Sequence, residues 1–488
     1  MNSRCVMVLG TTSGAGKSWL GTALCRWYAR QGLKVAPFKA QNMSNNARVV
    51  AGGEIGSAQY FQALAARAEP DVRMNPVLLK PERDTHSQLV LLGQVHEELT
   101  AMPWRGRSEH VWPHIARSLD ALRADNDVVV IEGAGSPAEI NLMASDIVNL
   151  RVARHAGARC LLVTDIDRGG AFAHLYGTWA LMPEADRALL RGFVLNRFRG
   201  DASLLAPAPQ DLQRLTGVPT VATLPMWRGH GLPEEDGWYG EEGAGGTDSA
   251  TAARTIAVIA YPRISNLDEF QPLAHLPGVR LRWVRHPAQL EGAHTIVLPG
   301  SKATSADLAW LRAQGLDRAV AAHAAAGGAV LGICGGLQML GEALIDPHGI
   351  DGNAPGLGLL PLVTVFERDK TVRRRSATFA DARGAWSALS GVTVQGYEIH
   401  HGQTAQHPAM AAGGQLAQPV LQDAGQGLGW CNGVGNVLGC YLHGLFEDPQ
   451  VLRALFGADV PTLDSVFDGL ADYIDEHFDT GVLPGLIA

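Results

Sequence analysis

The chain of 488 residues is poor in cysteine and aromatic residues and has no long apolar run. Its six cysteines are scattered without a C-x-x-C pair, which argues against a zinc site and against a disulfide framework. The apolar run before Gly10 is too short for the hydrophobic region of a signal peptide, and no later segment is long enough to span a membrane. We therefore expect a protein of the reducing cytoplasm that has no membrane partner.

Positive charge is also scarce. Lysine and arginine number 40 against 48 aspartate and glutamate residues, so the formal net charge is −8. A nucleic-acid partner is not expected, because a broad nucleic-acid surface needs an excess of positive charge. Apolar residues make up 46% of the chain, which is enough for two or three domains with ordinary cores. The sequence carries no signal for an oligomeric state.

Short apolar runs alternate with longer amphipathic segments. Strands are predicted at Val6–Leu9, Lys34–Pro37, Val128–Ile131, Cys160–Thr164 and Gly192–Leu195, and helices at Ser18–Arg30, Ile55–Ala68 and His114–Ala124. A second series of strands starts at Thr255 and continues at Val279–Val284, Thr295–Leu298 and Ala329–Ile333. Such alternation is typical of mostly parallel sheets with helices on both faces. The predicted fold class is therefore α/β, with two doubly wound, mostly parallel-sheet domains.

The composition changes between the two series. Residues 229–252 have few apolar side chains and many glycines and acids, which predicts a linker. We therefore expect a first domain over residues 1–228, a second over 253–448, and a helical tail over 449–488. Helices are predicted in the tail at Val451–Phe456 and Leu463–Phe478, and we expect the tail to pack on the second domain.

A glycine-rich loop, Gly10-Thr-Thr-Ser-Gly-Ala-Gly-Lys-Ser18, joins the first predicted strand to the first helix. Backbone N–H groups at such a helix N-terminus bind phosphate, Lys17 would reach the terminal phosphates, and Ser18 would bind Mg²⁺. Five residues separate Gly10 from Gly16, where the strict motif has four, so an ordinary glycine-rich turn is the alternative. The residues expected to bind ATP are Thr12, Gly14, Ala15, Gly16, Lys17 and Ser18.

Two acids are further candidates for Mg²⁺. Glu132 ends an apolar strand and would lie at the same sheet edge as the phosphate loop, although a solvated strand end is the alternative. Glu54 is the weaker candidate, because an acid at the start of a helix usually serves the helix dipole.

A polar stretch follows the second predicted strand. Lys39 could neutralise a substrate carboxylate, although an isolated lysine is more often a surface residue. Gln41, Asn42 and Asn45 suit a substrate with many carboxylates and carboxamides, but they could equally cap their own backbone.

A second glycine-flanked turn surrounds Cys334, between a predicted strand and a predicted helix. A thiol at a helix N-terminus is favoured as thiolate, and the glycines on both sides favour a nucleophile over a packed core cysteine. The candidate base is His443, for which an ordinary loop histidine is the alternative. Backbone N–H groups could stabilise an oxyanion. The residues expected there and around glutamine are Gly300, Ser301, Gly335 and Gln338.

Several segments together resemble the cobyric acid synthase family. They are Pro37–Asn46, Met74–Pro81, Glu132–Leu142, Thr164–Ala173, Leu298–Thr304, Gly396–Gly402 and Tyr441–Phe446. The resemblance implies a first domain similar to dethiobiotin synthetase and a second of the class I glutamine amidotransferase type. It implies the use of ATP, Mg²⁺ and L-glutamine to amidate the b, d, e and g carboxylates of a corrinoid, cobyrinic acid a,c-diamide, usually adenosylated. Acyl phosphates would form, with Cys334 as nucleophile and His443 as its base.

One position departs from the wider amidotransferase pattern. Those domains usually place a glutamate two residues after the histidine, where this chain has Leu445. Glu447 lies four residues after His443, and the sequence does not show that it reaches the imidazole, so the third member of the site stays open.

Three other functions would also account for part of this sequence pattern. One is the sister enzyme that amidates the a and c carboxylates of cobyrinic acid, and another is a split system that amidates a cell-wall precursor. The third is a partitioning-type ATPase that switches partners with its nucleotide, in which the Cys334 turn and His443 would have no role.

Overall fold

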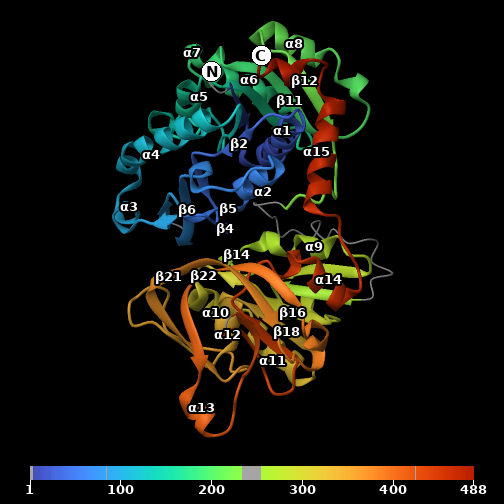
Figure 1. Cartoon of the computed structure of the whole chain (residues 1–488). Coiled ribbons are helices and arrows are strands. Elements are labelled where there is room, and N and C mark those ends of the chain that lie inside the picture. Colours follow the sequence, from blue (N-terminus) through green and yellow to red (C-terminus); the bar gives the residue numbers. More distant parts are fainter. Residues whose placement is uncertain (1–3, 84, 234–253, 424) are drawn as a thin grey trace.

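The computed structural model describes residues 4–83, 85–233, 254–423 and 425–488, which form two α/β units in contact with each other (Figure 1). Most of the predicted linker, residues 229–252, lies outside the described residues. The ends of the two predicted domains stay a prediction.

The first unit is built on a six-stranded parallel sheet with the order β12-β11-β10-β1-β9-β2. Its strands are β1 (Arg4–Gly10), β2 (Val35–Phe38), β9 (Val128–Glu132), β10 (Arg159–Asp165), β11 (Leu190–Phe198) and β12 (Thr220–Pro225). Alternate residues of β1 enter different cores, with Val6 and Val8 in one and Met7 and Leu9 in the other. Both faces of the sheet are therefore buried, as the continuous apolar runs predicted.

Helices cover both faces of this sheet. Those of the first unit are α1 (Lys17–Arg30), α2 (Ser57–Ala65), α3 (Glu97–Ala101), α4 (Trp104–Asp125), α5 (Leu150–Ala156), α6 (Ala171–Leu181), α7 (Glu184–Arg187) and α8 (Ala208–Thr216). Helices α1 and α2 pack on the face of Val6 and Val8, whereas α4, α5, α6 and α8 pack on the face of Met7 and Leu9. The predicted alternation of strands and helices is confirmed.

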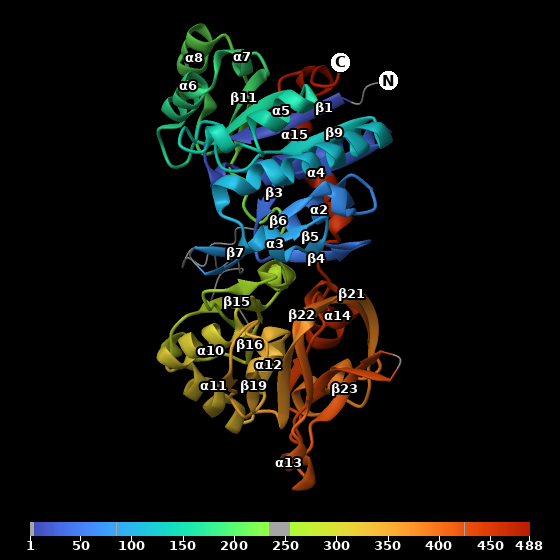
Figure 2. The ribbon, with the colours of Figure 1, turned by 90° about the vertical axis from the view of Figure 1, so that its left-hand side faces the viewer.

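Small strands at the boundary with the second unit were not predicted. They form a sheet of β3 (Gln41–Met43), β6 (Val77–Arg83), β7 (His86–Leu91) and β8 (Gln94–Val95), and a hairpin of β4 (Ala47–Val50) and β5 (Gly53–Gly56). They lie between the main sheet and the second unit (Figure 2). The predicted helix over 55–68 is shorter in the structure, because β5 occupies its first residues.

The second unit is built on an eleven-stranded mixed sheet with the order β15-β13-β16-β18-β25-β24-β23-β21-β19-β20, in which β22 also pairs with β21. Its parallel part is β13 (Arg254–Ile259), β15 (Val279–Val284), β16 (Thr295–Leu298), β18 (Ala329–Ile333) and β25 (Val437–Cys440). The remaining strands are β19 (Ala343–Ile345), β20 (Ala354–Pro355), β21 (Leu362–Phe379), β22 (Thr393–Gln406), β23 (Gln418–Asp423) and β24 (Gln426–Cys431). A short pair, β14 (Ile264–Ser265) and β17 (Gly300–Ser301), lies apart from this sheet. The predicted strands belong to the parallel part.

The helices of the second unit flank the parallel part of its sheet, except the last of them, which connects β22 to β23 and lies at the end of the unit farthest from the first unit (Figure 1). They are α9 (Gln271–Ala274), α10 (Thr304–Ala313), α11 (Leu316–Ala325), α12 (Gly335–Leu340) and α13 (Pro408–Ala412). Short 3-10 helices of both units are η1 (Ser13–Ala15), η2 (Val72–Met74), η3 (Met143–Ser145), η4 (Ala202–Leu205), η6 (Leu267–Phe270), η7 (Pro287–Leu290), η8 (Gly384–Leu389) and η9 (Leu445–Glu447). In the described part of the chain, no helix combines the length and apolar character needed to cross a membrane.

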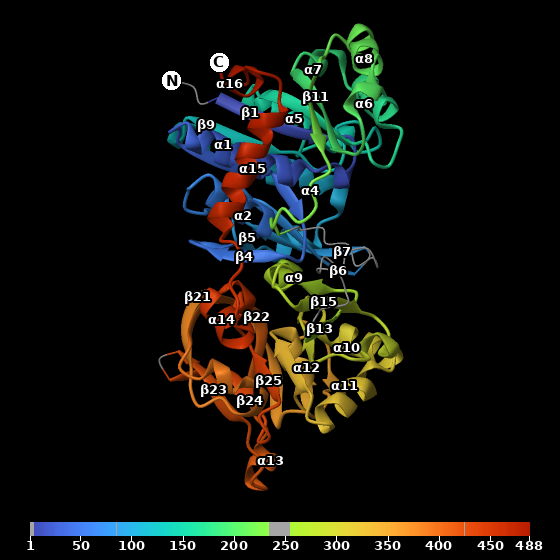
Figure 3. The same cartoon turned by 90° about the vertical axis from the view of Figure 1, so that its right-hand side faces the viewer.

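The C-terminal segment returns to the first unit. Helix α14 (Pro449–Phe456) packs on the second unit, as predicted, but α15 (Leu463–His477) runs along α1, and α16 (Val482–Gly485) follows it (Figure 3). Phe467 and Leu470 of α15 join the core of Leu24, and the hydroxyl of Tyr28 donates to the Leu483 carbonyl at 2.9 Å. The expectation that the whole tail packs on the second domain is therefore wrong for α15, because its apolar face covers α1.

Candidate active sites

The phosphate loop follows β1 and leads into α1. Gly16 has a φ of +98°, and a Cβ atom there would lie 2.1 Å from Nδ2 of Asn196, so the turn requires glycine. Nζ of Lys17 donates to the carbonyl oxygens of Thr12 and Ser13 at 2.8 and 3.1 Å, which places it over the loop. The residues expected to bind ATP lie in η1, at its ends and in the first turn of α1: Thr12, Gly14, Ala15, Gly16, Lys17 and Ser18.

Three predicted residues from distant parts of the chain meet beside this loop. Oγ of Ser18 donates to Oε1 of Glu132 at 2.8 Å, and Nζ of Lys39 lies 2.8 Å from the same oxygen. Gln62 donates to the other oxygen at 2.6 Å. Burial alone raises the pKa of Glu132, but Lys39 and these hydrogen bonds outweigh burial and lower it. Glu132 is thus a carboxylate, and Mg²⁺ takes such oxygens together with those of phosphate groups.

Glu54 does not share these contacts. Its carboxylate lies between Lys80, at 2.7 Å, and Lys370 of the second unit. Burial raises the pKa of Glu54, but the Lys370 and Lys80 ammonium groups outweigh burial and lower it to about 2. Both oxygens of Glu54 bind ammonium groups, so Ser18 and Glu132 remain the candidate magnesium ligands. The described residues contain no cluster of three or more His, Cys, Asp or Glu suited to a metal ion.

The residues predicted to bind the acid substrate form a run instead of a cluster. Lys39 lies beside the phosphate loop, Gln41 and Asn42 belong to β3, and Asn45 lines the pocket of Cys334. The run therefore leads from the phosphate loop to the boundary with the second unit.

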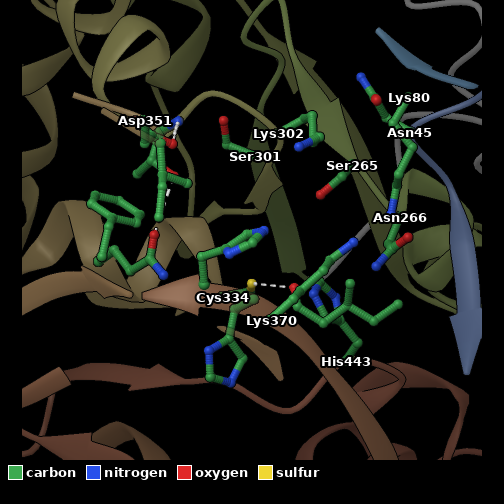
Figure 4. Close-up of a pocket in the computed structure, with 17 residues that line it drawn as sticks. Asn45, Lys80, Ser265, Asn266, Ser301, Lys302, Cys334, Asp351, Lys370 and His443 are labelled. Atoms are coloured by element: carbon green, nitrogen blue, oxygen red, sulfur yellow. Dashed lines mark hydrogen bonds between the residues drawn. The ribbon is translucent and has the colours of Figure 1, made fainter. Parts of the chain in front are cut away.

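Cys334 stands at the sharp turn between β18 and α12. Its φ is +50°, which is a strained conformation for a residue with a side chain. The turn lies against β16, since a Cβ atom at Gly336 would be 1.8 Å from the Leu298 carbonyl oxygen. The structure thus forms the predicted strand–turn–helix elbow, with the Cys334 side chain lining a pocket (Figure 4).

His443 lines the same pocket and is held by a carboxylate that the sequence analysis missed. Nδ1 of His443 donates to Oε1 of Glu269 at 3.0 Å, and the N–H of Gly444 donates to Oε2 of Glu269 at 2.9 Å. Burial alone lowers the pKa of His443, but the charges of Glu269 and Cys334 outweigh burial and raise it to about 10. Because Nδ1 is engaged by Glu269, Nε2 is the nitrogen that serves the thiol.

Glu269 fills the position that the sequence analysis left open. Glu447, the residue considered there, pairs with Arg48 of the first unit instead. Glu269 precedes His443 by 174 residues, so no spacing rule would connect the two. The local signal that could have pointed to it is the acidic pair Asp268-Glu269, which stands between apolar residues.

The residues predicted for the oxyanion and for glutamine surround this pocket. Ser301 and Gln338 line it. A Cβ atom at Gly335 would lie 2.7 Å from the backbone nitrogen of Ser301, and one at Gly300 would lie 2.9 Å from Cε1 of His443. The first of these approaches brings the backbone of Ser301 against Gly335, the residue that follows Cys334, and backbone N–H groups so placed can stabilise an oxyanion.

Ammonium groups of the pocket were also missed. Lys80, Lys302 and Lys370 line it together with Cys334, and Lys302 lies 2.8 Å from Glu82. Lys80 and Glu82 belong to the first unit, whereas Lys302 and Lys370 belong to the second. Both units therefore build the pocket around the thiol.

Replacing Glu269 with glutamine is expected to lower kcat for glutamine hydrolysis about 100-fold or more, the range of a lost acid–base contribution. The amide does not balance the charge of the imidazole, and it keeps one acceptor oxygen for the two donors, His443 and Gly444. The pKa of His443 is therefore expected to fall and its limb of the pH–rate profile to move to lower pH. Glutamate release at saturating glutamine, measured across pH, checks both effects. Amidation from ammonium is the control, since it bypasses the thiol; an unchanged kcat and profile would contradict this role.

Comparisons with known proteins cover both units. Residues 6–228 match the model of a CobQ/CobB/MinD/ParA nucleotide binding domain, and residues 255–451 that of a CobB/CobQ-like glutamine amidotransferase domain. The chain is 79% identical over 488 residues to a cobyric acid synthase of Variovorax paradoxus, with 100% of both chains covered. It is 73% identical over 491 residues to that of Polaromonas naphthalenivorans, again with 100% of both covered. A solved structure of PurLQS from Thermotoga maritima aligns with 42% of this chain and 98% of its own at a TM-score of 0.32 and 16% identity, too low to carry an argument.

Proposed function

The chain belongs to the cobyric acid synthase family, and we propose that it amidates the b, d, e and g carboxylates of cobyrinic acid a,c-diamide, usually adenosylated, with ATP and L-glutamine. The observation that carries this proposal is the pocket around Cys334, which residues of both units line. Ammonia freed at this thiol would be released at the boundary with the unit that carries the phosphate loop.

In the second unit, Nε2 of His443 takes the proton of the Cys334 thiol, and the thiolate attacks the side-chain carbonyl carbon of glutamine. Backbone N–H groups near Ser301 and Gly335 stabilise the resulting oxyanion. The C–N bond breaks as His443 returns the proton to the leaving nitrogen, and ammonia departs. Water then hydrolyses the thioester to glutamate, while Glu269 keeps the imidazole oriented.

In the first unit, the phosphate loop and Lys17 bind the phosphates of ATP. Ser18 and Glu132 would hold Mg²⁺, which would supply charge neutralisation for phosphoryl transfer. Lys39 orients the substrate carboxylate, whose oxygen attacks the γ-phosphate and releases ADP. Ammonia then attacks the carbonyl carbon of the acyl phosphate, phosphate leaves, and the amide forms.

Replacing Lys39 with alanine is expected to lower kcat/KM for the corrinoid at least about tenfold, which corresponds to a loss of about 1.4 kcal/mol of transition-state stabilisation. ATP affinity is expected to change less, because Lys17 and the loop N–H groups stay in place. Initial rates with varied corrinoid, together with ATP titrations, check this split. The matched control is Lys34→Ala, an exposed lysine that directly precedes β2, the strand that Lys39 follows. Unchanged corrinoid kinetics would contradict the assignment of Lys39.

Mass spectrometry of the corrinoid product tests the function itself. When cobyrinic acid a,c-diamide is supplied with ATP and with glutamine labelled at the amide nitrogen, the corrinoid product is expected to carry four labelled nitrogen atoms. Amidation of unamidated cobyrinic acid at the a and c carboxylates alone would favour the sister enzyme. ATP hydrolysis without any glutamine use would favour the partitioning-type ATPase, in which the contact of Glu269 with His443 would have no catalytic role.

A further inference from the structure

Strand β4 of the first unit carries a buried arginine into the second unit. The side chain of Arg48 is 3% exposed and pairs with Asp268 and Glu447, both of the second unit. Nη1 donates to Oε2 of Glu447 at 2.8 Å, and Nη2 lies 2.6 Å from Oε1. The guanidinium group thus bridges two carboxylates across the boundary, at which β4 lies in Figures 1 and 3.

These two acids flank the pair that orients the base. Asp268 directly precedes Glu269 in η6, and Glu447 ends η9, which begins just after His443 and Gly444. Glu269 joins the two elements by accepting hydrogen bonds from His443 and Gly444. Arg48 therefore links η6 to η9. The distance between these two elements determines whether Glu269 can contact the imidazole of His443.

The charges at this point make the arginine necessary. Asp268, Glu269 and Glu447 bring three carboxylates together, and the positive groups that face them include Arg48 and His443. Burial and the Asp268 and Glu269 charges raise the pKa of Glu447, while Arg48 opposes this rise. Without the guanidinium group, η6 and η9 would be pushed apart by their own acids.

An aromatic ring adds a second contact between Arg48 and the base. The Arg48 guanidinium lies 5.3 Å from the centroid of the Tyr397 ring, which is within the range of a cation–π interaction. The same ring stacks on His443, with centroids 5.3 Å apart and an interplanar angle of 19°. Displacing the guanidinium group would thus also disturb the ring against which the imidazole rests.

The segment that carries Arg48 begins in the nucleotide site. Lys39 contacts Glu132 beside the phosphate loop. Further along, the N–H of Ala47 donates to Oδ1 of Asn266 at 2.9 Å, and the N–H of Leu267 donates to Oδ1 of Asn46 at 3.1 Å. Residues 39–48 therefore connect the site of the first unit to η6, which holds Glu269.

We propose that Arg48 is a positioning residue for glutamine hydrolysis, so that the first unit completes the catalytic arrangement of the second. This inference rests on the proposed function. Glutamine hydrolysis at Cys334 would then depend on the first unit through one side chain, that of Arg48, which contacts both η6 and η9.

Glutamine hydrolysis and ammonium-dependent amidation, measured in the full-length enzyme, test this proposal. Arg48→Met is expected to lower kcat for glutamine hydrolysis at least about tenfold with little change in KM, and to leave amidation from ammonium within about twofold. Arg48→Lys is expected to recover part of kcat, because an ammonium group keeps the charge but not the fork that bridges two carboxylates. Asp268→Asn, which keeps the arginine, is expected to lower kcat in the same direction.

The matched control is Arg26→Met, which removes another fully buried arginine that pairs with acids of a distant segment, Asp464 and Asp468 of α15. It is expected to affect the two nitrogen sources alike. Unchanged glutamine hydrolysis in Arg48→Met, or an equal loss from both nitrogen sources in both Arg48 variants, would overturn the proposal. A wild-type enzyme that does not hydrolyse glutamine would instead refute the proposed function.

Discussion

Cys334→Ala is expected to abolish amidation from glutamine, by about a thousandfold or more, and to leave amidation from ammonium close to the wild-type rate. In the proposed mechanism the thiolate is the nucleophile that attacks the glutamine amide, so its loss would remove the covalent route. Ammonia enters after that step, at the first unit, whose phosphate loop the substitution does not touch. Initial rates with saturating glutamine and, separately, with ammonium at a pH that supplies free ammonia check this result.

A neighbouring cysteine provides a matched control. Cys440 lies on the adjacent strand, and its carbonyl oxygen accepts the N–H of Cys334 at 2.8 Å. Burial raises the pKa of the Cys440 thiol to about 12, so it stays protonated near neutral pH. Cys440→Ala is therefore expected to keep both activities. Loss of both activities in Cys334→Ala, or retention of both, would contradict a nucleophilic Cys334.

Lys17→Ala is expected to remove amidation from either nitrogen source, by about a hundredfold or more. In the proposed mechanism the ammonium group of this lysine is the positive charge that reaches the transferring phosphate, and charge stabilisation supplies most of the catalysis of phosphoryl transfer. Glutamine hydrolysis measured without ATP is expected to persist, since Cys334 and His443 lie in the other unit. Parallel assays of amide formation and glutamate release measure the reactions of the first and the second unit separately.

A second substitution of Lys17 controls for a change in the conformation of the phosphate loop. Nζ of Lys17 donates to two carbonyl oxygens of the loop, so its removal also frees those acceptors. Lys17→Arg keeps a donor near them but places the charge differently, and it is expected to retain nucleotide binding with little amidation. An alanine variant that amidates at the wild-type rate would refute the role of the loop.

Local motifs were predicted well because neighbours along the chain decide them. The loop before Lys17 and the turn at Cys334 each need glycines at fixed positions between a strand and a helix, and the structure forms both. The meeting of Lys39 with Glu132 was also expected in outline, since parallel strands place their carboxyl ends at one sheet edge. Apolar periodicity likewise predicted the two series of strands.

Other features depend on which surfaces meet, and a linear pattern does not encode this. The amphipathic tail was expected to be helical, but an apolar face does not specify which apolar surface it will cover. That α15 packs on α1 is therefore decided only in the assembled fold. The β3–β8 strands and the long β21–β22 ribbon were missed for a related reason. In β4 and β5, for example, the charged side chains of Arg48 and Glu54 are buried against residues of the second unit, which the local sequence does not indicate.

The division of labour in the active site follows the same reasoning. Residue order alone was enough to predict a nucleotide loop, a nucleophile and its base, because each belongs to a short motif with its own chemistry. Glu269 and Arg48 belong to no such motif. A carboxylate acquires its function through the imidazole it contacts, and a buried arginine through the charges it bridges. The contact of Glu269 with His443 forms only when the second unit folds, because 174 residues separate the two, and the contacts of Arg48 form only when the two units pack.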